Sequence, residues 1–405
     1  MAIDTPKDFI LLALLLKRYP LDPKEFLDLD WSAVAAKFPQ PHWLRPRDFE
    51  TIIYPRLREN WQERPIGQSY EGRTLRAWEW GEGATRVLIW AQMHGDETTA
   101  SQALSDLANF FKTHPEMARR WKKQLKIALI LPLNPDGAER RTRRNAQQID
   151  LNRDLLALAS PEMQAFETYR QNFDPHWAFN LHDQRSIFSV APEQKAAVLS
   201  FLAPSFNPER EINEARRKSM ALIAQLAGLN HQLIPGQIGR YSDEFYPLAL
   251  GDNLTAAGIP TVLIETAPHN FSGSRQRSRE LLFRSLLVSF DYLAAGDFTA
   301  SEKEYFALPE NEPKHRDLIF RAVKVRDSQP FQVDIAIQRE WQADPEQDKL
   351  SERWRLSDWG DLRHFKAHRT VEGGELKSAL PEPGALANLG IPEAKVKIIK
   401  GIWQD

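Results

Sequence analysis

Residues 87–97 read Val-Leu-Ile-Trp-Ala-Gln-Met-His-Gly-Asp-Glu, and this stretch decides the fold class. Its first part is a continuous apolar run, which is typical of a strand buried on both faces of a sheet. Polar residues follow at the point where such a strand ends. Ligands of open α/β sheets bind just past the carboxyl ends of the strands. Residues 94–97 therefore mark a candidate site at that edge.

Three further apolar runs are each followed by polar or turn-forming residues. Residues 127–133 precede Asn-Pro-Asp-Gly at 134–137, residues 177–181 precede His182, and residues 261–264 precede Glu265. Helical patterns lie between the runs, at residues 101–112, 209–226 and 277–294. This alternation predicts an α/β fold with a mixed, mainly parallel sheet flanked by helices.

The pattern changes at both ends of the chain. After Gly296, residues 319–325, 332–338 and 395–399 alternate apolar and polar side chains, which predicts a small β-rich domain. Residues 1–45 favour one or two short helices. We therefore expect an N-terminal helical extension at 1–45, an α/β domain at 46–297 and a small β-rich C-terminal domain at 298–405.

Composition narrows the function classes. Of the 405 residues 42% are apolar and 27% charged, as in ordinary folded proteins. The net charge of -2 gives no attraction to nucleic acid or anionic lipid, so neither partner is expected. The apolar run at 9–16 is far shorter than the roughly 20 residues that span a bilayer, and its flanks are poor for a signal peptide. We expect a buried helix there and a cytoplasmic location.

The absence of cysteine excludes disulfides and thiolate zinc sites, so any zinc needs His and carboxylate ligands. Catalytic zinc uses three protein ligands and keeps one position open. His94 and Glu97 are three residues apart, Gly95 between them permits a tight turn, and His182 follows a later strand. Alone, a His-x-x-Glu pair is common by chance, and a single His at a strand end is more often a structural residue.

The surrounding motifs decide between these interpretations. Besides Asn-Pro-Asp-Gly at 134–137, residues 143–154 read Arg-Arg-Asn-Ala-Gln-Gln-Ile-Asp-Leu-Asn-Arg-Asp. With these motifs the chain resembles the zinc carboxypeptidase family related to carboxypeptidase A. That family's order is His-x-x-Glu, Asn-Pro-Asp-Gly, an Arg, Asp-x-Asn-Arg, a His after a strand and a Glu after a later strand. All of these occur here in order, and residues 66–73 resemble the segment that precedes the first ligand motif.

The resemblance implies a role for each matching residue. His94, Glu97 and His182 would hold one Zn²⁺ per chain, and Glu265 would be the general base. Arg143 would stabilise the oxyanion, with Arg144 as a rival. Asn152 and Arg153 would bind the terminal carboxylate of a substrate, and Asp150 would orient His94.

The sequence departs from the family pattern near its substrate pocket. The family places a Tyr on a loop before the general base, and either Tyr241 or Tyr246 fits. Asp252 and Gly251 lie where the family builds its side-chain pocket, without indicating a preference. Asp183 and Arg185 either line the pocket or are surface charges. His269 is a possible further site residue, and His364 and His368 are expected on the surface.

The expected function is that of a zinc-dependent metallocarboxypeptidase, which hydrolyses the C-terminal peptide bond of peptides through a metal-activated water. An alternative with the same fold is an amidohydrolase acting on N-acyl amino acids or peptidoglycan stem peptides. A binding module without activity would require loss of a ligand or the base, and none is missing. The expected partner is a peptide or small peptide-like substrate, and the oligomeric state is left open.

Overall fold

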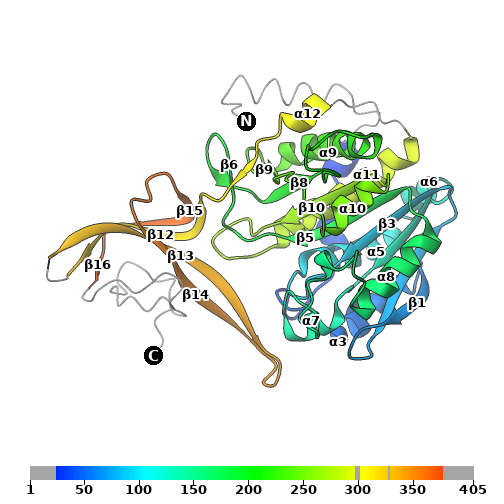
Figure 1. The fold of residues 1–405 in the computed structure, drawn as a ribbon, viewed down its shortest axis with the longest axis horizontal. Coiled ribbons are helices and arrows are strands. Elements are labelled where there is room, and N and C mark those ends of the chain that lie inside the picture. The colour runs from blue at the N-terminus through cyan, green and yellow to red at the C-terminus, as the bar shows by residue number, and fades with distance from the viewer. Residues whose placement is uncertain (1–23, 297–301, 327–328, 377–405) are drawn as a thin grey trace.

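The computed structural model describes residues 24–296, 302–326 and 329–376. Figure 1 shows a large α/β body and a β-rich region that projects from it. No helix in these ranges is long and apolar enough to cross a membrane. The helix expected at 9–16 and the strand expected at 395–399 lie outside the described residues.

The centre of the α/β body consists of the four predicted strands. These are β3 (Thr85–Ala91), β4 (Leu125–Ile130), β5 (Trp177–Asp183) and β10 (Thr261–Thr266). Strand β3 lies between β4 and β5, β10 pairs with β5, and all three pairings are parallel. Strand β4 ends three residues earlier than predicted, just before Leu131 and Pro132.

Four further strands, joined to the central strands by antiparallel pairing, complete the sheet, and the sequence did not single them out. On one side lie β1 (Gln62–Gln68) and β2 (Thr74–Gly81), and on the other β8 (Leu199–Leu202) and β9 (Ile238–Arg240). The strand order is β1-β2-β4-β3-β5-β10-β8-β9. The predicted mixed sheet flanked by helices is confirmed.

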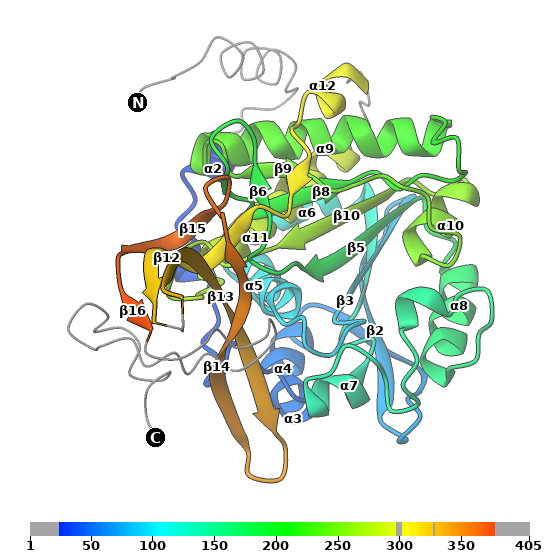
Figure 2. The same cartoon turned by 60° about the vertical axis from the view of Figure 1, so that its left-hand side comes forward.

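Helices cover both faces of this sheet (Figure 2). One face packs against α5 (Thr99–Thr113), α6 (Pro115–Lys122), α9 (Glu214–Leu233) and α11 (Gln276–Ala295). The other packs against α8 (Pro161–Phe173) and α10 (Leu250–Ala256), with α7 (Pro135–Arg140) nearby. The helix predicted from residue 209 begins at Glu214 because the Asn213 side chain caps it by accepting a hydrogen bond from Arg216 N.

The segment before the sheet packs onto the main core. It contains α2 (Lys24–Leu27), η1 (Trp31–Ala33), α3 (Pro46–Asp48), η2 (Phe49–Ile53) and α4 (Tyr54–Leu57). Buried Asp106 on α5 anchors it by accepting hydrogen bonds from Trp31 Nε1 (3.1 Å) and Ala36 N (2.8 Å), and Asp106 also pairs with Arg279. The division at residue 45 stays a prediction.

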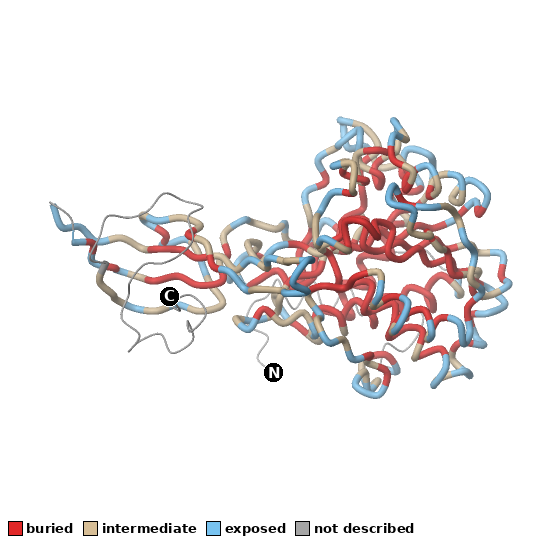
Figure 3. Tube along the Cα trace, turned by 90° about the horizontal axis from the view of Figure 1, so that it is seen from below, coloured by how far each residue is buried: buried red, intermediate tan, exposed pale blue. Residues whose placement is uncertain are grey.

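The C-terminal region is β-rich, as expected. Its sheet contains β12 (His315–Val325), β13 (Phe331–Asp344), β14 (Lys349–Gly360), β15 (Lys366–Glu372) and the short β16 (Glu375–Leu376). A small core of its own, including Phe320 and Ile335, holds it together, and Figure 3 shows this core as a separate buried stretch. The strands expected at 319–325 and 332–338 are present within β12 and β13.

The link between the two parts is built into the α/β body. Tyr305 of α12 (Glu302–Phe306) is buried in the main core, and its hydroxyl accepts a hydrogen bond from Ala203 N. Strand β11 (Asn311–Glu312) pairs with β6 (Ser189–Val190), which pairs with β7 (Lys195–Ala196). The β-rich region is therefore attached through paired backbone, and the division at 297 stays a prediction.

Candidate metal centre and active site

The sheet brings the predicted ligands and base to one edge. His94 follows β3, His182 lies near the end of β5, and Glu265 lies near the end of β10. His182 and Glu265 are register partners on neighbouring parallel strands. Their side chains therefore share one face of the sheet at about 4.8 Å spacing.

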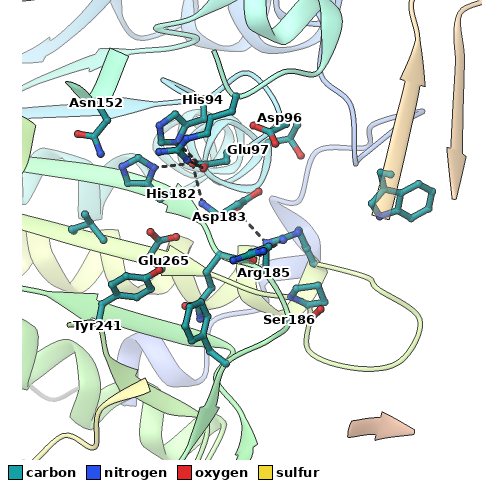
Figure 4. A pocket seen from close by; sticks show the side chains of 18 of the residues that line it. His94, Asp96, Glu97, Asn152, His182, Asp183, Arg185, Ser186, Tyr241 and Glu265 are labelled. Atoms are coloured by element: carbon teal, nitrogen blue, oxygen red, sulfur yellow. Dashed lines mark hydrogen bonds and ion pairs between the residues drawn. The ribbon is translucent and has the colours of Figure 1, made fainter. Parts of the chain in front are cut away.

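His94, Glu97 and His182 form one buried cluster (Figure 4). Glu97 Oε1 lies 2.7 Å from His94 Nδ1, and Glu97 Oε2 lies 2.8 Å from His182 Nδ1. One ligand atom from each residue lies within 4.8 Å of the other two. The three residues predicted from sequence are thus the ones that the fold brings together.

A close backbone approach explains Gly95 better than the expected tight turn. Gly95 is not among the residues with positive φ. A Cβ atom added there would lie 2.0 Å from the carbonyl carbon of Gly137. The two ligands of the His-x-x-Glu motif are therefore held by direct packing of this loop against the start of α7.

Asn134 connects three parts of the site. Its side chain caps α7 by accepting a hydrogen bond from Gly137 N (2.8 Å), and its Nδ2 donates to Met93 O (3.2 Å) and Arg143 O (3.3 Å). This fixes the loop of Arg143 beside His94. Buried Asp136 accepts hydrogen bonds from Ser69 Oγ (2.7 Å) and Glu71 N (2.9 Å), so the Asn-Pro-Asp-Gly motif also holds the 66–73 segment.

Charges around the cluster favour a cation. Burial lowers the pKa of His94, but Glu97 and the hydrogen bond with Asp150 outweigh it and raise the pKa to about 9. Burial likewise acts to raise the pKa of Glu97, yet His94 and His182 hold it well below its usual range. The carboxylates of Glu97 and Asp150 therefore stabilise positive charge at this point.

The donor set fits zinc. Asp150 Oδ1 lies 3.1 Å from His94 Nε2, so a neutral His94 that donates to Asp150 presents the lone pair of its Nδ1 to a metal ion. Such a carboxylate on the second ring nitrogen is the usual support of a zinc-binding His. The Nε2 atom of His182 is buried and has no hydrogen-bond partner within the described ranges. Two imidazole nitrogens and one carboxylate form a ligand set typical of hydrolytic zinc sites.

Arg143 is fixed beside the cluster. Its Nε donates to Asp150 Oδ2 (3.0 Å), and its Nη1 lies 3.1 Å from His94 Nδ1 and 3.7 Å from Glu97 Oε1. The rival Arg144 is exposed, donates to Gln148 O and does not line the cavity. The structure therefore favours Arg143 as the cation of the site.

A cavity of about 780 Å³ opens over the cluster and includes Glu265. The Oε2 atom of Glu265 is buried and has no hydrogen-bond partner among the residues described. Burial, and then the negative charge of Glu97, raise the pKa of Glu265 well above its usual value. A carboxylate in this setting binds a proton more readily than an exposed one.

One end of the cavity carries the predicted carboxylate-binding residues. The Asn152 side-chain oxygen accepts a hydrogen bond from Leu250 N (3.0 Å), and the Arg153 guanidinium lies 4.3 Å from the ring centroid of Tyr246. Asp252 accepts a hydrogen bond from Tyr246 N (3.1 Å), and burial raises the pKa of Asp252 to about 6.

The two candidate tyrosines occupy different places in this cavity. Tyr246 stacks on Arg153 at the end just described. Tyr241 packs against Phe188, with ring centroids 5.4 Å apart. Burial and then the charge of Glu265 raise the pKa of Tyr241 to about 12. Tyr246 thus lies beside the predicted carboxylate-binding residue Arg153, and Tyr241 lies near the predicted base, Glu265.

The remaining candidates divide clearly. Asp183 and Arg185 line the cavity, whereas His269 lines two smaller pockets elsewhere. His364 is exposed, as expected. The surface placement expected for His368 is wrong. Its Nε2 is buried, and its ring lies edge-on to His315 at 4.5 Å, because β15 pairs with β12 at the seam with the α/β body.

Sequence reasoning missed part of the cavity wall. His42 and Arg141 line it from the α/β body, and the C-terminal region contributes Asp317, Gln338, Arg339, Glu340 and Trp341. No local pattern marks these residues, because they reach the cavity only through contacts between distant segments.

Comparison with known proteins agrees with this geometry. Residues 60–204 match the family model described as zinc carboxypeptidase. The chain is 25% identical over 176 residues to probable carboxypeptidase 2 of Trichophyton verrucosum and 24% identical over 199 residues to carboxypeptidase 2 of Trichophyton tonsurans. These matches cover 43% and 49% of this chain, but only 30% and 32% of those relatives.

Two solved structures share the fold. Bovine thrombin-activatable fibrinolysis inhibitor, in complex with tick carboxypeptidase inhibitor, gives a TM-score of 0.50 at 14% identity and covers 64% of this chain and 99% of that one. Carboxypeptidase A of Helicoverpa armigera gives a TM-score of 0.50 at 13% identity. The match covers 73% of this chain and 80% of that one. The family model spans both histidine ligands, Glu97 and the Asn152–Arg153 pair. The chain therefore resembles the zinc carboxypeptidase family over residues 60–204, which include His94, Glu97 and His182.

Proposed function

We propose that this protein is a zinc-dependent carboxypeptidase that removes the C-terminal residue of peptides. The observation that carries the proposal is the arrangement of one cavity. It holds the buried His94–Glu97–His182 cluster at its centre, Glu265 beside it and the Asn152–Arg153 pair at one end.

His94, Glu97 and His182 would hold one zinc ion, which when bound polarises a scissile carbonyl and lowers the pKa of water to roughly 7. The remaining roles belong to the chain. Glu265, buried and without a partner among the described residues, takes the proton of the attacking water and passes it to the leaving amine. Arg143, fixed by Asp150, stabilises the charge on the carbonyl oxygen.

The Asn152–Arg153 end determines where the peptide is cut. A planar guanidinium donates two parallel hydrogen bonds to a carboxylate, which a point charge cannot reproduce. The aromatic face of Tyr246 fixes the plane of Arg153 from one side. A free C-terminal carboxylate bound here places the last peptide bond near Glu265 and the cluster.

Substrates that differ only in the terminal carboxylate test this proposal. The wild type should cleave free-acid peptides far better than their C-terminal amides. Arg153→Ala should lower kcat/KM on free-acid peptides by about 10- to 1,000-fold, since a charge-assisted pair contributes roughly 1.5–3 kcal/mol and an unpaired carboxylate adds to the loss. Arg153→Lys should recover only part of the activity.

Arg144→Ala is the matched control, because Arg144 is exposed and lies outside the cavity. It should leave the preference for free acids unchanged. Equal cleavage of amides and free acids by the wild type would disprove the carboxylate-binding role, and the amidohydrolase alternative would then lead.

A further inference from the structure

Residues 338–341 of β13 form part of the cavity wall, and β13 pairs with β14 in a ribbon of two strands. Strands β13 and β14 pair from Asp334 and Gly360 out to Asp344 and Lys349, whereas the register of β12 with β13 ends at Leu318 and Ile337. The outer half of the ribbon therefore extends beyond its own sheet. A two-stranded ribbon is marginally stable by itself, so this one needs support from elsewhere.

Contacts with the α/β body supply that support. Asp348, in the turn of the ribbon, pairs with buried Arg45 and with Arg47 (2.8 Å). The ring of Trp341 stacks on His42 with centroids 4.4 Å apart and planes at 17°. Both the tip and the middle of the ribbon are thus fixed to the N-terminal part of the chain (Figure 2).

Arg141 closes the seam between these walls. Its Nε donates to His42 O (2.8 Å) and its Nη1 donates to Trp341 O (2.8 Å). Because the rings of His42 and Trp341 are stacked and the Arg141 guanidinium bonds to both residues, no peptide can pass between them. This seam forms part of the cavity wall.

The cavity runs from the carboxylate-binding end to the ribbon. In Figure 4, Asn152 and Tyr241 lie on one side of the His94–Glu97–His182 cluster, while Asp183 and Arg185 lie on the other, toward the ribbon strands. Trp341, Arg339 and Asp317 of the C-terminal region line this second side. A peptide with its C-terminus at Arg153 extends its preceding residues toward Trp341.

We infer that the β13–β14 ribbon restricts this enzyme to short peptides, with Trp341 as the residue that determines substrate length. The inference rests on the proposed carboxypeptidase function and names its substrate class. A cavity of 780 Å³ lies within the range that encloses a drug-sized ligand, roughly three to five peptide residues. The N-terminal residues of longer peptides collide with the stacked rings of Trp341 and His42.

A series of free-acid peptides tests the ribbon. The peptides share their last three residues and are lengthened at the N-terminus with Gly and Ser. The wild type should show kcat/KM at least about 10-fold lower for peptides of about twelve residues than for those of about four, because the longer chains exceed the extended reach of the cavity. Trp341→Ala should raise the long-to-short ratio at least about fivefold.

Asp348→Ala provides a second test, since it removes the ion pairs that fix the tip of the ribbon and substitutes no residue that lines the cavity. It should raise the ratio in the same direction. Trp359→Ala is the matched control. Trp359 is an exposed Trp of the same ribbon that does not line the cavity, so the ratio should stay at the wild-type value. Equal wild-type rates for long and short peptides, or an unchanged ratio in both variants, would overturn the inference.

Failure of the proposed function gives a different result. If the proposed function fails because no peptide is cleaved, calorimetric binding of the same series to zinc-loaded protein replaces the rates. Weaker binding of the long peptides supports the ribbon as a wall. Equal affinities, or no binding of any length, overturn it.

Discussion

His182 and Glu265 are register partners on neighbouring strands, yet their surroundings give them different chemistry. His182 Nδ1 faces the carboxylate of Glu97 at 2.8 Å, as a ligand would. Glu265 instead faces the cavity, and its pKa is raised by burial and by the charge of Glu97. We therefore propose metal binding for His182 and proton transfer for Glu265, and their variants should fail in different ways.

His182→Ala should lose most of its zinc, because two remaining ligands rarely hold the ion. Metal analysis of purified protein should give close to one zinc per chain in the wild type, if the proposed stoichiometry is correct. Full zinc content in His182→Ala would contradict the ligand assignment.

Glu265→Gln should keep its zinc and lose turnover by at least about 100-fold, the scale of general-base loss. Glutamine is nearly isosteric with glutamate but cannot accept the proton of water. Zinc content and peptidase rate measured on the same preparation distinguish the two variants. Near-normal turnover would show that another residue is the base.

Among the elements, the loop after β3 positions the metal ligands. Gly95 lies against the start of α7, where a Cβ would meet the backbone of Gly137 at 2.0 Å. Gly137 is equally confined, since its own Cβ would lie 2.5 Å from Asn134 Nδ2. The spacing of His94 and Glu97 thus depends on two glycines in contact, one in each motif.

Gly95→Ala should therefore weaken zinc binding although no ligand is changed. Overpacking of this kind costs about 1–3 kcal/mol, and the loop of His94 has to move to relieve the clash. The expected result is a measurable loss of zinc to a competing chelator while the protein stays folded.

Gly67→Ala serves as the control, because its Cβ would meet the Ala165 side chain at 2.6 Å on a different helix. It should lower stability without changing zinc retention. If Gly95→Ala retains zinc as tightly as the wild type, close packing does not position the ligands.

In the whole molecule, two histidines lie where the β-rich region meets the α/β body. His315 Nδ1 lies 3.0 Å from Ser186 O, and the rings of His315 and His368 meet at an interplanar angle of 72°. Burial and then the neighbouring His368 lower the pKa of His315 to about 4, and burial and then Arg339 lower that of His368 to about 4. Both rings are neutral in the folded protein at neutral pH.

Depressed histidine pKa values predict how stability depends on pH. In the unfolded chain these histidines become protonated near pH 6.5, whereas in the folded protein they become protonated only near pH 4. The contribution of these two histidines to the free energy of unfolding is therefore fully present above pH 6.5, and it is lost as the pH falls toward 4. For one such histidine, the loss between pH 7 and pH 5 is about 2 kcal/mol.

Urea unfolding of His368→Gln at pH 7 and pH 5 checks this effect. The variant should lose about 2 kcal/mol less than the wild type over this interval. His364→Gln, on an exposed part of the same region, should behave as the wild type. The same pH dependence in all three proteins would exclude a contribution from this seam.

The central strands, the fold class and the shared edge that brings the predicted ligands together all follow from patterns in the sequence. Each of these is a local pattern. A strand buried on both faces needs a continuous apolar run, and parallel strands end at the same edge, so His94, His182 and Glu265 had to lie close together. The motif order supplied the candidate roles of Arg143, Asn152 and Arg153.

The walls of the cavity, and the choice between rival residues that could line it, depend on the tertiary structure. It separated Arg143 from Arg144, placed Tyr246 on Arg153 and Tyr241 beside Glu265, and showed that Gly95 is required by a neighbouring backbone. Trp341 lies far from His42 in sequence, and their stacking depends on how a ribbon from one sheet packs on another part of the fold. Such contacts leave no periodic pattern in the sequence, because they depend on the relative position of complete elements.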